Sequence, residues 1–395
     1  MRHPDFTLTG GPMPASSRTL AALGSPIIYH YDPVFLERFA ELERKVGAIY
    51  GTANDIVLMQ GEAVLGLEAA ARALVRPGMA CLNLASGVYG KWFGLWLAEY
   101  GADLVEVEVP YDEAIDPADV ERAFRERPEI ELLAVVHSET PSGTVNPIAE
   151  ICPIAKRHGA VTIVDVVSSL GGTAVRPDEW GLDVCVAGPQ KCLSGPPGMS
   201  LVSVSEDAWA AIRNNPGAPR GSFLSLLDWK ETWIEGGRTQ FPYTPSVAEV
   251  HGVSAACDEA LEEGLEAVIE CHDRAARACR AGVKAMGLEL WAKSEEIAAN
   301  CVTAVRKPDG VAVAEVLRHA RERYGVMLSA GYGELKPKLI RIGHMGVAAR
   351  SLNVVVGLSA LGRTLADLGA PVRTGEGVEA ALEVLSQPHK VGSAA

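Results

Sequence analysis

The sequence lacks cysteine pairs with metal-ligand or redox spacing. Its eight cysteines are scattered, and none stands in a Cys-x-x-Cys pair, so zinc and thiol-redox motifs are weak interpretations. Basic residues are also in the minority: 36 Lys and Arg stand against 50 Asp and Glu, giving a formal net charge of −14. A general nucleic-acid binder needs a basic face, so this class of partner is disfavoured.

Long apolar runs are absent as well. No stretch reaches the ~18 apolar residues that a membrane span requires, and no apolar run follows the charged start of the chain, so no signal peptide is evident. Cysteines within apolar runs suit a reducing compartment. We therefore expect a cytoplasmic protein without a membrane partner. The 395 residues, 48% of them hydrophobic and 22% charged, are enough for two domains of a well-packed globule.

What the sequence does contain is an alternation of short apolar strands with amphipathic helices. This pattern predicts a mainly parallel sheet with helices on both faces, in an α/β domain. The predicted strands cover residues 56–59, 80–85, 104–109, 132–136, 161–164, 184–186 and 199–204.

The same pattern divides the chain into four segments. Residues 1–30 form an N-terminal arm, in which the pair Gly10 and Gly11 lets the backbone approach a ligand closely. The large α/β domain covers 31–255 and contains an irregular region at 215–250. A connecting helix at 256–285 belongs to a long helical stretch, roughly 246–286. A smaller α+β domain at 286–390 has strands near 301–306, 325–329 and 338–343.

Polar residues follow several of these strands. In open α/β sheets, ligands bind outside the carboxyl ends of the strands, so side chains at these positions converge on one rim. The residues that we expect there are Glu62, Tyr89, Thr140, Asp165 and Lys191.

Lys191 stands in a turn rich in glycine and proline, residues 187–198. A lysine held in a partly dry turn loses hydration, so its pKa can fall until the free amine attacks a carbonyl. Such a lysine forms a Schiff base with a pyridoxal-type ligand, whose ring nitrogen needs a carboxylate such as Asp165. Tyr89 could stack on the ring and Thr140 could bond to a ring substituent. Each residue also has a purely structural interpretation. These are a solvated loop lysine for Lys191, a turn cap for Asp165, a packing residue for Tyr89 and a turn residue for Thr140.

Four longer runs carry a family resemblance: 61–70, 83–91, 139–144 and 188–193, with Arg341–Gly346 near the end. Over nearly the whole chain the sequence resembles class V, fold-type I aminotransferases of the alanine–glyoxylate type. The resemblance implies a large domain with a mainly parallel sheet of the seven-stranded type and a smaller α+β C-terminal domain. It also implies that Lys191 forms the Schiff base and shuttles a proton. Asp165 would pair with the ring nitrogen, and Arg341 would hold the carboxylate of the amino or oxo acid.

Glu62 distinguishes this chain from ordinary relatives, which carry small hydroxyl residues where the first helix begins and bind the cofactor phosphate there. Two anions ~4 Å apart repel by ~4 kcal/mol at an effective dielectric of ~20. Phosphate is therefore disfavoured, whereas the hydroxymethyl group of unphosphorylated pyridoxal can donate a hydrogen bond to Glu62. The structural alternative is that Glu62 points outward and phosphate binds as usual.

The expected reaction is amino-group transfer from pyridoxamine to pyruvate, giving pyridoxal and L-alanine, with pyridoxal as a substrate. In the subfamily that uses these two substrates, a second arginine stands nine residues before the carboxylate-binding one. Here Tyr332 occupies that position, so the identity of the oxo acid stays undecided. The family places its site at a subunit interface. We therefore expect a homodimer or homotetramer in which Tyr29, and Thr244 from a neighbouring subunit, line the site.

Other interpretations remain open from sequence. One is a conventional aminotransferase with resident pyridoxal phosphate (PLP), acting on alanine or serine with glyoxylate or pyruvate. Another is a non-catalytic relative that only binds a B6 vitamer. A lyase of the cysteine-desulfurase type would need a nucleophilic cysteine late in the chain, and none follows Cys301. A metal site at His137, Glu139 and His344 matches no trusted ligand spacing, so no metal is expected.

Overall fold

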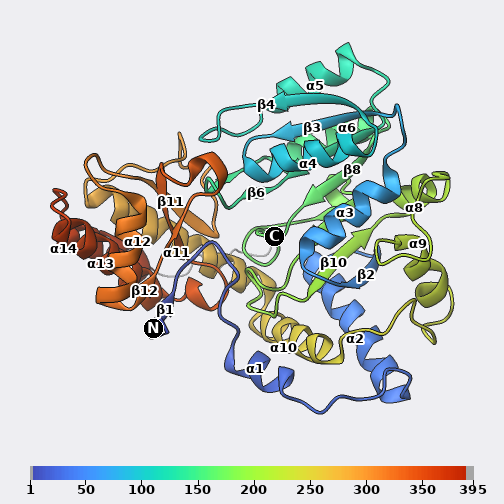
Figure 1. Cartoon of the computed structure of the whole chain (residues 1–395), viewed down its shortest axis with the longest axis horizontal. Helices are drawn as coiled ribbons and strands as arrows, with labels where there is room; N and C mark the ends of the chain where they lie inside the picture. Colours follow the sequence, from blue (N-terminus) through green and yellow to red (C-terminus); the bar gives the residue numbers. More distant parts are fainter. Residues whose placement is uncertain (1–2, 388–395) are drawn as a thin grey trace.

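The computed structural model of the chain describes residues 3–387 and is built around one large sheet (Figure 1). Its seven strands lie in the order β2-β10-β9-β8-β5-β3-β4. Strand β10 runs antiparallel to both of its neighbours, and the other pairs are parallel. The strands are β2 (Asp55–Gln60), β3 (Ala80–Ala85), β4 (Asp103–Glu108), β5 (Leu132–Val136), β8 (Val161–Asp165), β9 (Val184–Ala187) and β10 (Met199–Val204). The predicted α/β fold class is confirmed.

The central strands are apolar because helices cover both faces of the sheet. Every residue of β5, Leu-Leu-Ala-Val-Val, is buried, as a parallel strand packed on two sides requires. The connecting helices are α3 (Ala63–Leu74), α4 (Val88–Glu99), α5 (Pro117–Glu126), α6 (Ile148–Arg157), α7 (Pro177–Trp180) and α8 (Glu206–Arg213), and α2 (Pro33–Tyr50) packs beside β2. Together they enclose the larger apolar core of the chain.

A second apolar core lies in the C-terminal part, at the left of Figure 1. It is built on an antiparallel sheet ordered β11-β14-β13. Its elements are α11 (Leu265–Ala285), β11 (Val302–Arg306), α12 (Val313–Tyr324), β13 (Ser329–Ala330), β14 (Leu339–Gly343), α13 (Ser351–Asp367) and α14 (Thr374–Ser386). The domain boundaries given above stay a prediction, and residues 388–390 of the predicted last domain lie outside the described residues.

The predicted helical stretch at 246–286 consists of two helices, so the connecting helix predicted at 256–285 is not a single unit. Helix α10 (Val247–Glu263) ends at Gly264, whose positive φ of 88° breaks the helical path before α11 begins at Leu265. Glycine adopts this backbone region without a Cβ penalty, so it can turn the chain between two helices that are each apolar on one side. The helical period continues across the break, which is why sequence periodicity did not find it.

The region 215–250 is also more regular than predicted. It contains the short helix α9 (Leu226–Asp228) and a π-helical segment η1 (Trp229–Ile234). Trp229 and Trp233 of this segment are almost fully buried, and Trp233 stacks on Phe241 with ring centroids 4.3 Å apart. Trp229 stacks on Phe39 of α2, with ring centroids 5.8 Å apart. This contact joins segments distant in sequence, so local propensity gives no signal for it.

The N-terminal arm crosses from the larger core to the smaller one. Its strand β1 (Phe6–Thr7) pairs in parallel with β12 (Val326–Met327), and helix α1 (Ser17–Leu23) packs on α10. The backbone N–H of Gly343 donates to the Leu8 carbonyl at 2.9 Å. The predicted strand at 325–329 is thus two short strands, β12 and β13, because one pairs with the arm and the other with β14.

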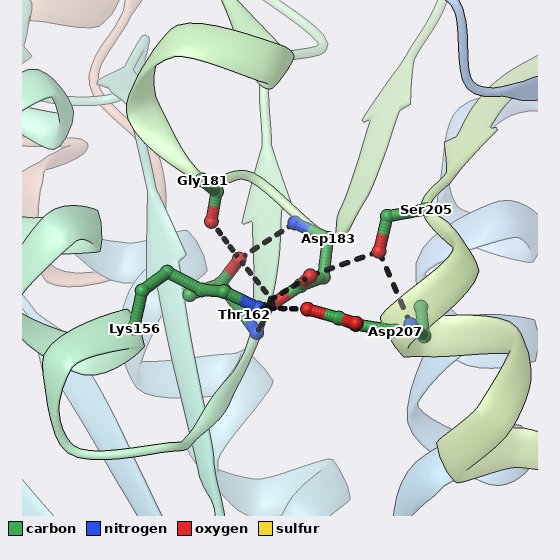
Figure 2. Close-up of polar contacts among 7 residues, drawn as sticks. Lys156, Thr162, Gly181, Asp183, Ser205 and Asp207 are labelled. Atoms are coloured by element: carbon green, nitrogen blue, oxygen red, sulfur yellow. Dashed lines mark hydrogen bonds and ion pairs between the residues drawn. The ribbon is translucent and has the colours of Figure 1, made fainter.

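The amino ends of β8 and β9 are held by the buried carboxylate of Asp183 (Figure 2). It accepts hydrogen bonds from Lys156 Nζ at 2.9 Å, from the Thr162 N–H at 2.9 Å and from Ser205 Oγ at 2.8 Å. Several donors therefore satisfy this buried charge, as burial demands. The network fixes the strands at the end opposite to the rim where the predicted site residues lie.

The remaining short elements are the hairpin strands β6 (Ser138–Glu139) and β7 (Thr144–Val145) and the 3-10 turns η2 (Gly333–Leu335) and η3 (Gly346–Ala349). No helix in residues 3–387 is both long and apolar enough to cross a membrane.

Candidate active site

A cavity of about 510 Å³ opens at the carboxyl ends of the parallel strands. It is lined by four of the five residues that the strand ends predicted, together with Tyr332: these are Glu62, Tyr89, Asp165 and Lys191. The fifth, Thr140, and the predicted carboxylate-binding Arg341 are not among the lining residues; they bond to each other, with Arg341 Nη1 donating to the Thr140 carbonyl at 2.7 Å. The structure thus gathers residues from four separate strand ends in one cavity.

Lys191 lies in a compact turn after β9. The turn is closed by backbone bonds from Gly195 to Pro189, 2.7 Å, and from Ser194 to Lys191, 3.1 Å. The lysine Nζ donates to the carbonyl of Gly10 in the N-terminal arm at 2.8 Å. Burial lowers the pKa of Lys191 below its ordinary value, with nearby acidic groups acting in the opposite sense. The free amine, which is the nucleophilic form, is therefore more accessible than in a solvated lysine.

Asp165 ends β8 beneath the cavity. One oxygen of its carboxylate accepts the Val167 N–H at 2.8 Å. Burial raises the pKa of Asp165 to about 7, while the bond from Val167 and the positive charge of Lys191 oppose this. A buried carboxylate with so little compensation favours a cationic partner in the cavity.

Tyr89 is held through its backbone by Glu139, a residue that sequence reasoning had considered only as a disfavoured metal ligand. The fully buried Glu139 carboxylate accepts the N–H groups of Tyr89, at 3.1 Å, and Gly90, at 2.6 Å, in the first turn of α4. A carboxylate at this end of a helix is favoured by the helix dipole. Burial still raises the pKa of Glu139 to about 7. The glycine at position 87 leaves room for the Glu139 side chain, because a Cβ there would lie 2.3 Å from Glu139 Cδ.

Two polar atoms beside the cavity have no hydrogen-bond partner among the described residues. They are the Oε1 of Gln190, which lines the cavity, and the Thr140 hydroxyl, which lies behind the lining next to the Tyr89 side chain. Buried polar groups are nearly always satisfied, so such atoms indicate a polar ligand. Gln190 precedes Lys191 and was missed as a site residue, because nothing in the sequence shows where its amide points.

Glu62 caps the amino end of α3 at the cavity. One carboxylate oxygen accepts the Val64 N–H at 3.0 Å, and the other accepts Gln190 Nε2 at 2.6 Å. The end of a helix is where an anion binds most readily, and here the protein's own carboxylate takes that place. Glu62 lines the cavity and is also exposed to solvent, so its role against phosphate stays a prediction.

Arg341 lies on β14 with its guanidinium fixed by backbone carbonyls. Its Nε donates to Ala330 at 2.5 Å and its Nη1 to Thr140 at 2.7 Å. The residue is only 9% exposed, and among residues 3–387 no carboxylate pairs with it. A buried guanidinium without an anion favours a carboxylate ligand, for which its planar fork is suited.

The comparisons with known proteins agree with this arrangement. Residues 17–355 match the family model of aminotransferase class V. The chain belongs to the class V aminotransferases. Among curated relatives, the pyridoxamine–pyruvate transaminase of Mesorhizobium japonicum is 47% identical over 390 residues, which cover 98% of this chain and 99% of that protein.

Solved structures give the same result. The crystal structure of pyridoxamine–pyruvate aminotransferase from Mesorhizobium loti matches with a TM-score of 0.95 at 47% identity, covering 97% of each chain. Ureidoglycine–glyoxylate aminotransferase from Bacillus subtilis matches with a TM-score of 0.92 at 28% identity, covering 98% of this chain and 100% of that one. The predicted family, fold class and enzyme class are confirmed.

In this aminotransferase, Tyr332 lies at the open side of the cavity, and its side chain is 48% exposed. Its ring lies edge-on to Trp92, with centroids 5.2 Å apart, and 6.5 Å from the ring of Tyr89. Tyr29 and Thr244 are exposed and lie outside the lining of this chain's own cavity. Their assignment to a site shared between subunits stays a prediction.

The two histidines of the disfavoured metal site form side-chain hydrogen bonds in this aminotransferase. His137 Nδ1 lies 2.9 Å from Ser169 Oγ, and His344 Nε2 lies 2.8 Å from Thr303 Oγ1. Over residues 3–387, no three His, Cys, Asp or Glu side chains are grouped so that they could hold a metal ion.

Proposed function

We propose that this aminotransferase moves the amino group of pyridoxamine to pyruvate, giving pyridoxal and L-alanine, and that it exchanges pyridoxal as a substrate. The observation that carries the proposal is the carboxylate of Glu62, bonded to Val64 and Gln190 at the helix end that faces the cavity. The relative from Mesorhizobium japonicum, named for this pair of substrates, supports it at 47% identity.

Electrostatics explains why Glu62 selects against phosphate. At ~4 Å and an effective dielectric of ~20, one pair of unit charges repels by ~4 kcal/mol, and each ~1.4 kcal/mol changes an equilibrium tenfold. Phosphate would also need the Val64 N–H, which already donates to Glu62. A hydroxymethyl group carries no charge and can donate to the same carboxylate, so the unphosphorylated vitamer fits this end of the cavity.

The other residues suit the ring of a B6 vitamer. When bound, pyridoxal supplies an aldehyde that reacts with amines and a protonated ring that withdraws electrons. Asp165 would hold the proton on the ring nitrogen, since its buried carboxylate lacks a cationic partner. The unpartnered hydroxyl of Thr140 would bond to a ring substituent, and Tyr89 would cover one face of the ring.

The reaction then needs one base and one anion-binding group. The Nζ of Lys191 would take the proton from the amine-bearing carbon of pyridoxamine and deliver it to the carbon of the oxo acid that becomes the alanine Cα, since burial favours its uncharged form. Arg341 would hold the carboxylate of pyruvate or alanine. Because backbone carbonyls fix the guanidinium at two of its nitrogens, it is oriented before the substrate arrives.

A second copy of the chain would complete the site. Apolar side chains are exposed around the cavity mouth and on the adjoining helix, with 49% of Val64, 42% of Trp92 and 60% of Leu95 accessible. Clustered exposed apolar side chains mark interaction surfaces. We infer a homodimer or homotetramer in which Tyr29, and Thr244 of a neighbouring copy, line the site. A cytoplasmic location remains part of this proposal.

The deciding experiment is an absorbance titration of the extensively dialysed protein with pyridoxal and then with PLP, followed by an assay of pyridoxamine with pyruvate. A colourless protein that gains a visible band with pyridoxal, binds PLP more weakly and forms pyridoxal from pyridoxamine supports the proposal. If the protein keeps its chromophore through dialysis, then it holds resident PLP. In that case it is a conventional PLP-bound aminotransferase, and the proposal is rejected.

A further inference from the structure

The side of the cavity where an oxo acid would enter is aromatic. Tyr332 and Trp92 meet edge-on at 5.2 Å, with Tyr89 the next ring inward. Tyr332 follows β13, whose Ala330 carbonyl fixes the Nε of Arg341 at 2.5 Å. The aromatic wall, defined here as Tyr332 and Trp92, is therefore connected to the group that would hold the substrate carboxylate.

The charges around the cavity leave room for only one substrate carboxylate. Lys191 is the cationic group and Glu62 and Asp165 are the acidic groups among the lining residues. Arg341 lies behind the lining, within electrostatic reach of Lys191 and Tyr89. Lys191 must give up its proton to react, so Arg341 is the one cation left for an anion. At the aromatic wall, a second carboxylate would find no further cation among the residues that line the cavity, and a carboxylate without a cationic partner is disfavoured to the extent that it loses its water.

The volume of the cavity allows more than a methyl group on the oxo acid. At about 510 Å³, it lies within the range that buries drug-sized ligands. The ring edges of Tyr332 and Trp92 offer apolar contacts to a longer side chain, which also prefers them to water.

We propose that Tyr332 determines the acceptor specificity, and that the enzyme takes 2-oxo acids with one carboxylate and an apolar side chain, including branched and aromatic ones. This inference rests on the proposed function, since it assigns the substrate class of the same site. The transfer balances without a further reactant: the vitamer amine becomes an aldehyde while the oxo group of the acid becomes an amine.

The test is an acceptor panel with pyridoxamine as the donor and pyridoxal release as the signal. The panel contains pyruvate, 4-methyl-2-oxopentanoate, phenylpyruvate, oxaloacetate and 2-oxoglutarate. We expect kcat/KM for the two larger apolar acids within about tenfold of pyruvate, and for the two dicarboxylates lower than pyruvate by about a hundredfold. A preference for a dicarboxylate, or rejection of every acid larger than pyruvate, overturns the inference.

Two variants sharpen the test. Tyr332→Arg supplies a cation at the wall, so the ratio of kcat/KM for oxaloacetate to that for phenylpyruvate should rise by at least about tenfold. Tyr332→Phe keeps the ring and should preserve the wild-type order of acceptors. An unchanged ratio in Tyr332→Arg, in a variant whose thermal unfolding matches wild type, contradicts the role of Tyr332.

Failure of the proposed function is recognised separately. If no acceptor releases pyridoxal from pyridoxamine, the same acids are tested as their amino-acid forms with PLP-loaded protein. If the amino acids in that assay follow the predicted order of side chains, then the specificity inference holds. Only the proposal that the unphosphorylated vitamer is a substrate is then rejected. A different order, or no transamination in either assay, overturns the inference as well.

Discussion

The amine of Lys191 donates a 2.8 Å hydrogen bond to the backbone carbonyl of Gly10, which joins the central residue of the site to the N-terminal arm. The arm is in contact with the second functional cation too: a Cβ on Gly10 would lie 2.5 Å from Arg341 Nη1, and one on Gly11 would lie 2.6 Å from Lys191 Nζ. The two glycines thus leave the space that the two cations occupy.

Replacing Gly10 by alanine should weaken binding of the oxo acid more than binding of the vitamer. The added methyl group would push the guanidinium of Arg341, which two backbone carbonyls hold in place. We expect KM for pyruvate to rise by about tenfold, equivalent to ~1.4 kcal/mol, while the affinity for pyridoxal changes by less than about threefold. Steady-state kinetics and a pyridoxal titration measure the two effects.

The matched control is Gly375→Ala, because a Cβ at that position meets no atom within 4 Å. Its kinetics should equal those of wild type. If Gly10→Ala raises KM for pyruvate no more than this control does, then the arm does not position Arg341.

Much of the fold and part of the site could be predicted from the sequence, because both depend on local signals. Strand and helix periods, and the polar residues that end strands, are short-range features, and they located Asp165 and Lys191. Gln190, Glu139 and the contacts of Gly10 were not found, because their roles depend on side chains that pack against them from distant segments. Gly264 was missed since a single glycine does not interrupt an apolar period that continues on both sides.

Replacing Glu62 by glutamine should improve PLP binding. The amide keeps the length of the side chain and removes the charge that repels phosphate, so the Kd of PLP should fall by more than about tenfold while that of pyridoxal changes less. Equilibrium titrations followed by absorbance give both values. Glu68→Gln, which changes the same charge on α3 where the side chain bonds to Tyr100 instead, is the control. Equal PLP affinity in wild type and Glu62→Gln would remove the repulsion argument.

Glu139 should make the fold less stable at higher pH. Burial raises its pKa from 4.5 to about 7, so its contribution to stability is fully present below pH 4.5 and is lost as the pH rises through about 7. At ~1.4 kcal/mol per pKa unit, the loss is on the order of 3 kcal/mol. Denaturant unfolding at pH 5 and pH 8 should show a larger decrease in the free energy of unfolding for wild type than for Glu139→Gln. The same decrease in both proteins contradicts the assignment.

The reactivity of Lys191 should depend on pH in the direction that its burial dictates. Because its pKa is lowered from 10.5, the rate at which pyridoxal produces the visible Schiff-base band should rise with pH to a midpoint below 10.5. Stopped-flow absorbance between pH 6 and pH 11 measures this profile. Lys191→Leu should give no band at any pH; a band that persists in this variant assigns the Schiff base to another amine.

Arg341 should contribute to binding of the oxo acid and not to binding of pyridoxamine. Hydrogen bonds to charged groups contribute about 1.5–3 kcal/mol, so Arg341→Ala should raise KM for pyruvate by roughly tenfold to a hundredfold, with a much smaller change for pyridoxamine. The alanine variant also deprives the Ala330 and Thr140 carbonyls of a donor, which would displace the Thr140 side chain together with its backbone. Arg341→Lys separates the two effects, because it keeps the positive charge and loses the planar fork. An intermediate KM for pyruvate with an unchanged pyridoxal titration is the expected result. If both variants raise KM for pyruvate and pyridoxamine equally, then the guanidinium supports the cavity wall and does not bind the substrate carboxylate.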